Sequence, residues 1–509
     1  MNRPRWLLSS SEFNFLHPVY WFGNVDARPL GLFRIAFAAL MLKEAVYHIF
    51  VAEIWYSDAG MLPLRLLPSV SPGTPTLMSG LNATWMAMAF FVVWAVVALL
   101  LLFGWQTRVM SILNLVLLVS VVNRNQMVVT GADNVMQVLA FWSLFVPLGR
   151  CYSVDARRRP PNPHPTTYAF PVRMLQIQIA LIYIFTVIFK LQGQTWPNGD
   201  ALYMAMQIKM HTFPVADWLL ANVSISVLRT FTFMALLVEV GFAVLIFAPI
   251  LQPYLRRVGL VAGVLLHVGI GLVMNIPNFP LVMIMSYLLL IDSGWTDWID
   301  RHLQINATSP QATNVVIPSP VQKAQSGCLG VLLAVPRGII HGSYRGILAC
   351  VLLAVMVFVI WGNFLTNDLL AIRLNVPAMP SAVEANLRAV GLWQSWALFA
   401  PDPLSYEGWF GVNGIFSDGQ IYDIRGGYER PHWYSGPLAR WGKLEENLMT
   451  KPKDDPLFSA WAAYICQQHP FDGLTGVQIV LYSRATSAPG QPFLPYQTTV
   501  LLGASCQPM

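Results

Sequence analysis

The sequence predicts a polytopic, all-α membrane bundle of about nine transmembrane helices, followed by a C-terminal extracytoplasmic domain of α+β or mostly β structure. Three observations predict this class. Hydrophobic residues make up 55% of the 509-residue chain and charged residues only 11%, whereas ordinary soluble domains carry about 25% charged residues. The apolar residues lie in long runs, and about 20 helical residues cross a bilayer. Basic residues, finally, lie mostly on one side of the predicted membrane plan.

Nine segments are predicted to cross the membrane. The second of them is the clearest, because every side chain in residues 85–103 is apolar or aromatic. The third and eighth are short for a membrane-spanning helix. In chain order, the segments are 30–50, 85–103, 109–122, 134–148, 174–191, 231–251, 258–274, 279–291 and 347–361.

The positions of lysine and arginine predict the orientation, because cytoplasmic loops are enriched in both. With the N-terminus in the cytoplasm and nine spans, fifteen basic residues fall on the cytoplasmic side and only Arg65, Arg124, Lys209 and Arg229 on the other. This asymmetry explains the formal charge of +6 without nucleic acid as a partner. It also depends on the count of nine, since it is lost if one span is removed.

An odd number of spans places the C-terminal region outside the cytoplasm. The expected division is a transmembrane domain over 1–295, a cytoplasmic linker over 296–345, a last transmembrane helix over 346–365 and a soluble extracytoplasmic domain over 366–509. Within that last domain, 409–416 and 420–424 read as a β-hairpin. A helix is predicted over 458–467, with strands over 477–484 and 496–502.

Ionisable side chains within predicted spans are candidates for function, because each costs about 2.5–3.5 kcal/mol at mid-membrane on insertion scales. Lys190 lies at the outer end of the fifth span, with Tyr183 and Thr186 near the same helical face. Such a stripe indicates a face turned towards the bundle interior, although a lysine that only anchors the helix at the interface explains the position as well. Glu239 and His267 lie in the middle of their predicted spans. A buried hydrogen bond between helices and a functional role explain these positions equally well.

The cysteines and the absence of common catalytic motifs limit the chemistry that the sequence predicts. Cys466 and Cys506 lie in the predicted extracytoplasmic domain, where an oxidising compartment allows a disulfide; two free thiols are the alternative. No Walker A, GxSxG, HExxH or dinucleotide-binding glycine pattern stands in a suitable context, and the cysteines show no metal-ligand spacing. No metal is therefore expected.

Several short stretches, in their order along the chain, resemble the vitamin K-dependent gamma-glutamyl carboxylase superfamily, also called the horizontally transferred transmembrane (HTTM) domain proteins. Together they cover about residues 20 to 293, and Trp196, His267 and Phe279 continue the pattern. The segment WALFAP at 396–401 is similar to a W-x-x-F-x-P segment that follows the membrane part in bacterial members. The stretches are 26–35 (DARPLGLFRI), 102–111 (LFGWQTRVMS), 153–155 (SVD) and 178–191 (QIALIYIFTVIFKL).

The resemblance implies a quinol chemistry. In the carboxylase, the lysine that matches Lys190 is the base that deprotonates vitamin K hydroquinone. A lysine can act in this way only when neutral, and an apolar setting favours the neutral amine. By the same resemblance, His267 and Glu239 would be catalytic residues in the same pocket as Lys190. Tyr183, Thr186 and Trp196 would contact vitamin K hydroquinone or a menaquinol-like quinol, and a peptide or protein substrate would reach the site at the outer face.

The sequence also departs from the carboxylase. The carboxylase has a histidine in the stretch that matches 130–141, which here reads TGADNVMQVLAF; Asp133 lies in it. The paired lysines of the carboxylase become Phe189 and Lys190, and the C-terminal domain is shorter. Two functions therefore stay open: a carboxylase-like lyase or quinol-oxygenating oxidoreductase, and a non-catalytic maturation, immunity or transport protein that binds partners with its outer domain. A bacterial inner membrane is the expected location.

Overall fold

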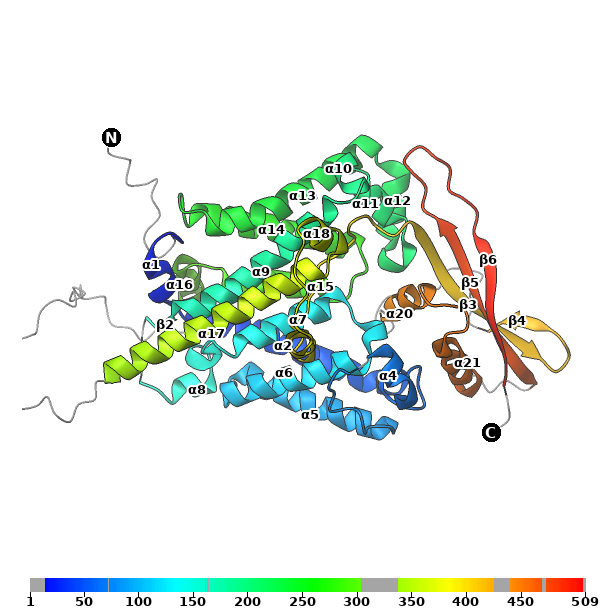
Figure 1. Cartoon of the computed structure of the whole chain (residues 1–509), viewed down its shortest axis with the longest axis horizontal. Coiled ribbons are helices and arrows are strands. Elements are labelled where there is room, and N and C mark those ends of the chain that lie inside the picture. Colours follow the sequence, from blue (N-terminus) through cyan, green and yellow to red (C-terminus); the bar gives the residue numbers. More distant parts are fainter. Residues whose placement is uncertain are drawn as a thin grey trace, which may run out of the picture.

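A computed structural model describes residues 14–71, 73–160, 162, 164–303, 337–424, 440–468 and 473–506, with only the helical backbone given for 337–343. Long helices form an elongated bundle, and a small sheet packs at one end of it (Figure 1). The core of the bundle is a continuous apolar cluster that includes Phe33, Trp94 and Trp142. This architecture agrees with the mostly helical bundle and small C-terminal sheet predicted from the sequence.

Six helices in the described part of the chain are long and apolar enough to cross a membrane. They are α5 (Thr84–Phe103), α6 (Thr107–Arg124), α9 (Ala169–Lys190), α13 (Ile225–Phe247), α14 (Tyr254–Val273) and residues Tyr344–Leu365 of α17 (Arg337–Leu365). The number rises to seven if Phe279–Leu289 and Ser293–His302, which meet at a bend of 100°, count as one broken span.

The predicted count of nine spans is not confirmed. Helix α2 (Arg28–Phe50) has the length of a span but carries Arg34, Lys43 and Glu44 within it. Helix α7 (Gly131–Ser143) has 13 residues, a rise of about 20 Å that is short of the ~30 Å hydrocarbon core. Helix α15 (Phe279–Ser286) is shorter still. The orientation, which depends on the count, stays a prediction.

Arg34 shows why a helix with an internal charge can lie inside this bundle. Its side chain is fully buried and donates to the carbonyls of Leu101 and Leu102 at 2.9 Å, and to that of Tyr152. Leu101 and Leu102 belong to the last turn of α5, where carbonyls lack partners within the helix. Arg34 therefore stabilises the end of a neighbouring helix, and its position near the end of a predicted span did not reveal this.

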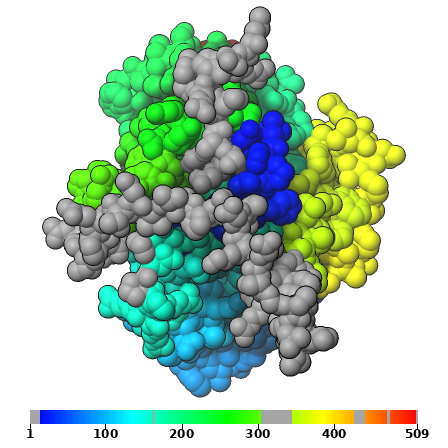
Figure 2. Space-filling model, turned by 90° about the vertical axis from the view of Figure 1, so that its left-hand side faces the viewer, coloured from blue at the N-terminus to red at the C-terminus, as the bar shows by residue number. Residues whose placement is uncertain are grey.

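Short helices connect the long ones. They include α10 (Thr195–Asn198), which follows α9, and α16 (Ser293–His302), which follows α15. Strands β1 (Asn24–Asp26) and β2 (Thr166–Tyr168) pair antiparallel beside α1. Figure 2 views this end of the bundle, with α1 in blue and α17 in yellow. The remaining short helices are α1 (Pro18–Phe22), α3 (Ala52–Tyr56), α4 (Leu67–Val70), α8 (Val154–Arg157), α11 (Ala201–Met206), α12 (Pro214–Asn222), α18 (Asp368–Arg373) and α19 (Ser381–Ala389).

The C-terminal part is a four-stranded antiparallel sheet of order β4-β3-β5-β6 with two helices. Its strands are β3 (Tyr406–Phe416), β4 (Ile421–Asp423), β5 (Leu474–Ala485) and β6 (Gln497–Ser505). The β3–β4 hairpin, both later strands and helix α21 (Pro456–Gln468) confirm the elements predicted there. Helices α20 (Arg440–Met449) and α21 lie between the sheet and the bundle (Figure 1). The extracytoplasmic location of this domain stays a prediction.

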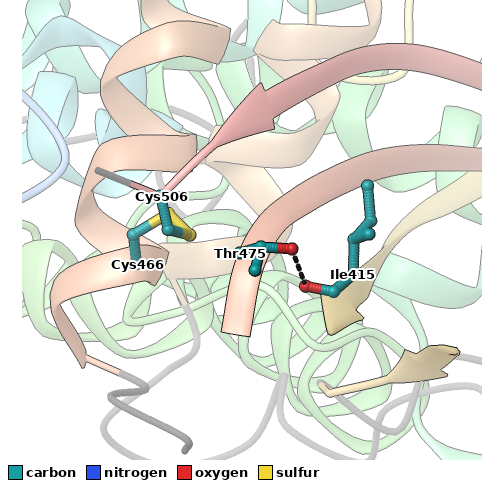
Figure 3. The surroundings of a disulfide bond; sticks show 4 residues. All are labelled: Ile415, Cys466, Thr475 and Cys506. Carbon is teal, nitrogen blue, oxygen red and sulfur yellow. Dashed lines mark hydrogen bonds between the residues drawn. A yellow bond between two sulfur atoms is a disulfide. The ribbon is translucent and has the colours of Figure 1, made fainter. Parts of the chain in front are cut away.

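Cys466 and Cys506 are joined by a disulfide between α21 and the residue that follows β6 (Figure 3). Beside it, the Cys506 backbone N–H donates to the Thr475 carbonyl at 2.8 Å, and the Thr475 hydroxyl donates to the Ile415 carbonyl at 3.0 Å. The bond thus fixes the helix to the end of the sheet where β5 begins.

Candidate functional site

A cavity of about 330 Å³ lies inside the bundle where α9, α13, α14 and α15 meet the C-terminal domain. Its walls are mainly apolar, and Ile182, Leu266 and Met283 are examples. All six side chains singled out from the sequence line this one cavity: Tyr183, Thr186, Lys190, Trp196, Glu239 and His267.

Lys190 and Glu239 form a buried ion pair in the cavity wall. Lys190 is the last residue of α9, and Glu239 lies in the middle of α13. The Lys190 Nζ atom lies 2.6 and 2.8 Å from the two carboxylate oxygens, and it lies 3.9 Å from the centroid of the Trp196 ring. Charges removed from water require such compensation. The pair therefore keeps a proton donor and a proton acceptor together in an apolar space.

A second polar cluster lies deeper, between α9, α14 and the turn after α15. The Tyr183 hydroxyl lies 2.7 Å from His267 Nε2 and also hydrogen-bonds the Tyr287 hydroxyl. His267 is buried, and its Nδ1 atom has no partner among the described residues. The Phe242 ring stacks on Tyr183 with the centroids 4.3 Å apart. Tyr183 therefore fixes the orientation of the His267 imidazole through its Nε2 atom.

The W-x-x-F-x-P segment forms part of the cavity wall. Thr186 Oγ1 donates to the Trp396 carbonyl at 3.2 Å, and Trp196 Nε1 donates to the Phe399 carbonyl at 2.7 Å. Asp402, just beyond this segment, accepts hydrogen bonds from the backbone N–H groups of Gln194 and Thr195. Although burial alone would raise it, these bonds and the Thr195 hydroxyl hold the pKa of Asp402 below its usual range. The segment is thus bound to the turn between Lys190 and Trp196.

The helix break at 275–280 also lines the cavity, through Asn275, Ile276, Pro277 and Phe279. The backbone N–H of Asn275 donates to the His211 carbonyl at 2.9 Å. Prolines and asparagines interrupt the helix here, and irregular backbone at membrane depth is tolerated where it lines a cavity. This break therefore contributes irregular backbone and side chains to the cavity wall.

Three charged or ionisable side chains border the cavity on the side of the C-terminal domain. His211 Nε2 lies 2.9 Å from one carboxylate oxygen of Glu446, and Lys443 Nζ lies 2.9 Å from the other. Burial acts to raise the pKa of Glu446, but the His211 and Lys443 contacts outweigh it and lower this pKa to about 2. Glu446 is therefore a carboxylate at physiological pH.

Arg440 was not predicted as a site residue from the sequence, and it is buried between the C-terminal domain and the bundle. It forms ion pairs with Asp133 at 2.9 Å and with Glu44 at 3.1 Å. Asp133 lies in the 130–141 stretch that departs from the carboxylase, and Glu44 lies in helix α2. Arg440 lies 307 residues beyond Asp133, and no local pattern links residues so distant.

The comparisons with known proteins agree with the resemblance read from the sequence. Residues 22–295 match the HTTM domain family, so more than half of the chain is covered and the chain belongs to this family of membrane proteins. A relative is the sporulation-delaying protein SdpB of Bacillus subtilis (strain 168), 22% identical over 222 residues. The match covers 42% of this chain and 64% of that protein. No solved structure matches.

Proposed function

We propose that this HTTM-domain protein is a membrane-embedded, carboxylase-like enzyme that takes a proton from a lipophilic quinol, as an oxidoreductase or a lyase. One observation carries the proposal: the six side chains expected from the carboxylase resemblance line one apolar cavity, with Lys190 and Glu239 paired inside it. A pair of titratable groups in an apolar cavity is a common arrangement for proton transfer.

The cavity suits a quinol ring. Its volume of about 330 Å³ lies at the lower end of the ~300–1,000 Å³ typical of small-molecule sites. Apolar walls fit a flat, lipid-soluble ring. The two hydroxyl groups of a quinol need hydrogen-bond partners, and the Lys190–Glu239 pair and His267 supply polar atoms for them. A reduced quinol, when bound, supplies an acidic hydroxyl and two electrons.

Each residue of the cavity would have a distinct role in binding the quinol or accepting its proton. The Lys190–Glu239 pair offers one proton-accepting position, either a carboxylate oxygen or, after transfer within the pair, the neutral Nζ of Lys190. Tyr183 orients His267, whose Nδ1 would hold the second polar end of the ligand. Thr186 and Trp196 bind the 396–401 segment and exclude water from the pair, which strengthens its electrostatic interactions.

The test is turnover in nanodiscs. Reduced menaquinone or vitamin K and oxygen are supplied to the purified wild type, to Lys190→Met and to Lys453→Met, an exposed control outside the cavity. We expect quinol oxidation by the wild type and the control, and a loss of at least a hundredfold in Lys190→Met. Equal rates with all three proteins would refute the assignment of Lys190.

A second candidate function is a non-catalytic maturation, immunity or transport protein that binds a polypeptide with its C-terminal domain. The size of that domain and the absence of a histidine in 130–141 favour it. It predicts that deletion of 380–509 abolishes rescue of a deletion strain while Lys190→Met rescues fully. The enzyme proposal predicts that Lys190→Met fails to rescue. We propose also that the protein lies in a bacterial inner membrane with its C-terminal domain outside the cytoplasm.

A further inference from the structure

One guanidinium group, that of Arg440, contacts residues that hold two walls of the cavity. Arg440 begins α20 and is 4% exposed. Its Nη1 and Nη2 atoms each lie 2.9 Å from an oxygen of Asp133, and Nη2 lies 3.1 Å from Glu44 Oε2. Nη1 also donates to the Val128 carbonyl at 2.9 Å. Such a two-point contact with a carboxylate fixes direction as well as distance.

The first wall depends on Asp133. This carboxylate accepts from the Thr130 backbone N–H at 2.7 Å and from the Thr130 hydroxyl at 2.8 Å, which closes the N-terminal cap of α7. Thr130 and Gly131 line the cavity. A shift of Asp133 therefore moves the start of α7 and the cavity wall with it.

The second wall depends on Glu44. Its Oε1 atom accepts from the Asn278 side-chain amide at 2.7 Å, and Lys43 contacts both residues. Asn278 belongs to the irregular 275–280 segment, whose Asn275, Ile276 and Pro277 line the cavity. Glu44 thus holds this segment against α2.

The third wall is α20 itself. Lys443 and Glu446 line the cavity. Lys443 follows Arg440 by three residues and Glu446 follows Lys443 by three, so each of these pairs is adjacent on the helix surface. His211 holds Glu446 from the bundle side at 2.9 Å. Arg440 therefore carries a wall of its own and anchors it to two others.

We propose that Arg440 is a positioning residue that holds helix α20 of the C-terminal domain in place as a wall of the cavity, so that this domain completes the site. The charges of the four ion-paired residues cancel: Arg440 and Lys43 are cationic, and Asp133 and Glu44 are anionic. Loss of Arg440 leaves two neighbouring buried carboxylates with one lysine, and their repulsion separates α7 from α2 and releases α20. The inference rests on the proposed function only in taking this cavity as the site.

Accessibility of the cavity tests the proposal without any turnover. Ala205, which lines the cavity and is 6% exposed, is replaced by cysteine in a chain whose Cys151, Cys328 and Cys350 are alanine. The rate of labelling by a hydrophilic maleimide in nanodiscs is measured. We expect Arg440→Met to label at least tenfold faster than wild type. Arg440→Lys keeps the charge but not the two-point contact, and it should label a few-fold faster.

Two further variants test whether faster labelling is specific to the loss of Arg440 or follows from the loss of any contact of α20. Asn447→Ala removes another contact of this helix, a 2.7 Å hydrogen bond to the Met127 carbonyl, and should label at the wild-type rate. Adding Glu44→Gln to Arg440→Met removes one uncompensated carboxylate and should slow the labelling again. Wild-type labelling in Arg440→Met, or equally fast labelling in Asn447→Ala, would overturn the proposal.

The same variants distinguish this inference from the proposed function. If Arg440→Met does not fold, the labelling rate of Arg440→Lys decides, and a wild-type rate there refutes the inference. If quinol is consumed, we expect Arg440→Lys to raise KM for the quinol more than it lowers kcat, because the cavity and not the proton-accepting pair is altered. If the wild type consumes no quinol, the proposed function fails while the labelling result still decides the role of Arg440.

Discussion

Lys190 and Glu239 contact each other through both carboxylate oxygens, at 2.6 and 2.8 Å, although they lie on different helices and are at least nine-tenths buried. The contact converts two costly intramembrane charges into a compensated pair. It also means that the lysine is not an isolated amine: any proton it takes or gives is shared with Glu239.

The first prediction concerns the stability of this pair. Lys190→Met leaves a buried carboxylate without its partner, and Glu239→Leu leaves a buried ammonium. Each should lower the free energy of unfolding by about 3–5 kcal/mol. The double variant Lys190→Met/Glu239→Leu removes both charges and should recover most of this loss. Denaturant unfolding in detergent measures the three values, and a double variant less stable than either single variant would contradict the account.

The second prediction compares two glycines on α14. A Cβ atom at Gly263 would lie 2.7 Å from the Tyr287 hydroxyl oxygen, whereas one at Gly269 meets nothing within 4 Å. Gly263→Ala should displace Tyr287 from Tyr183, weaken quinone binding at least tenfold and cost about 1–3 kcal/mol of stability. Gly269→Ala should be neutral, or stabilising by up to ~1 kcal/mol. Quinone titration of both proteins tests this, and equal affinities would separate the Tyr183 cluster from binding.

The third prediction concerns acid. Because the pKa of Glu446 is lowered to about 2 from an unfolded value near 4.3, its contacts with His211 and Lys443 contribute stability that is fully present above about pH 4.3. This contribution is lost as the pH falls towards 2. The difference in Tm between wild type and Glu446→Gln, measured from pH 5 downwards, should therefore shrink below about pH 4. A difference that grows on acidification would show that Glu446 is not held as the carboxylate.

The fourth prediction concerns the disulfide. Cys466 and Cys506 are 40 residues apart in sequence, and closing a loop of this size stabilises a domain by roughly 2–4 kcal/mol. Replacing both by serine should lower the stability of the sheet and α21 by that amount and leave the cavity intact. Mass spectrometry of protein from the native membrane without reductant checks the bond itself, and two free thiols would place this domain in a reducing compartment.

The class of fold could be predicted because a bilayer requires long apolar segments, and these can be recognised from the residue types alone. The sequence also predicted the C-terminal strands, whose alternating pattern and turn residues are local. The number of spans was harder to predict. Helices α7 and α15 are apolar but short, and most of their side chains are buried in the bundle. Apolarity does not distinguish a helix buried in protein from one in lipid.

The candidate site was foreseen in part. Lys190, Glu239 and His267 stood out because the membrane makes ionisable groups costly, and the resemblance supplied Tyr183, Thr186 and Trp196. Tyr287 and Arg440 were missed. Tyr287 lies within the predicted span 279–291, near its C-terminal end, and tyrosine is common near the ends of membrane spans. Arg440 lies in a polar domain, where an arginine carries no signal. Only the packing of segments far apart in the sequence brings these two to the site.

We propose that a lipophilic quinone binds in the Lys190–Glu239 cavity, and photolabelling of the cavity measures this binding site directly. The purified protein in nanodiscs is irradiated with a photoreactive menaquinone analogue, and the adducts are located by mass spectrometry with and without excess unmodified quinone. We expect adducts on cavity-lining peptides of α9, α13, α14 and the 396–404 segment, and we expect these adducts to be lost on competition. Adducts confined to the lipid-facing surfaces of α5 and α17, or unaffected by competition, would contradict it.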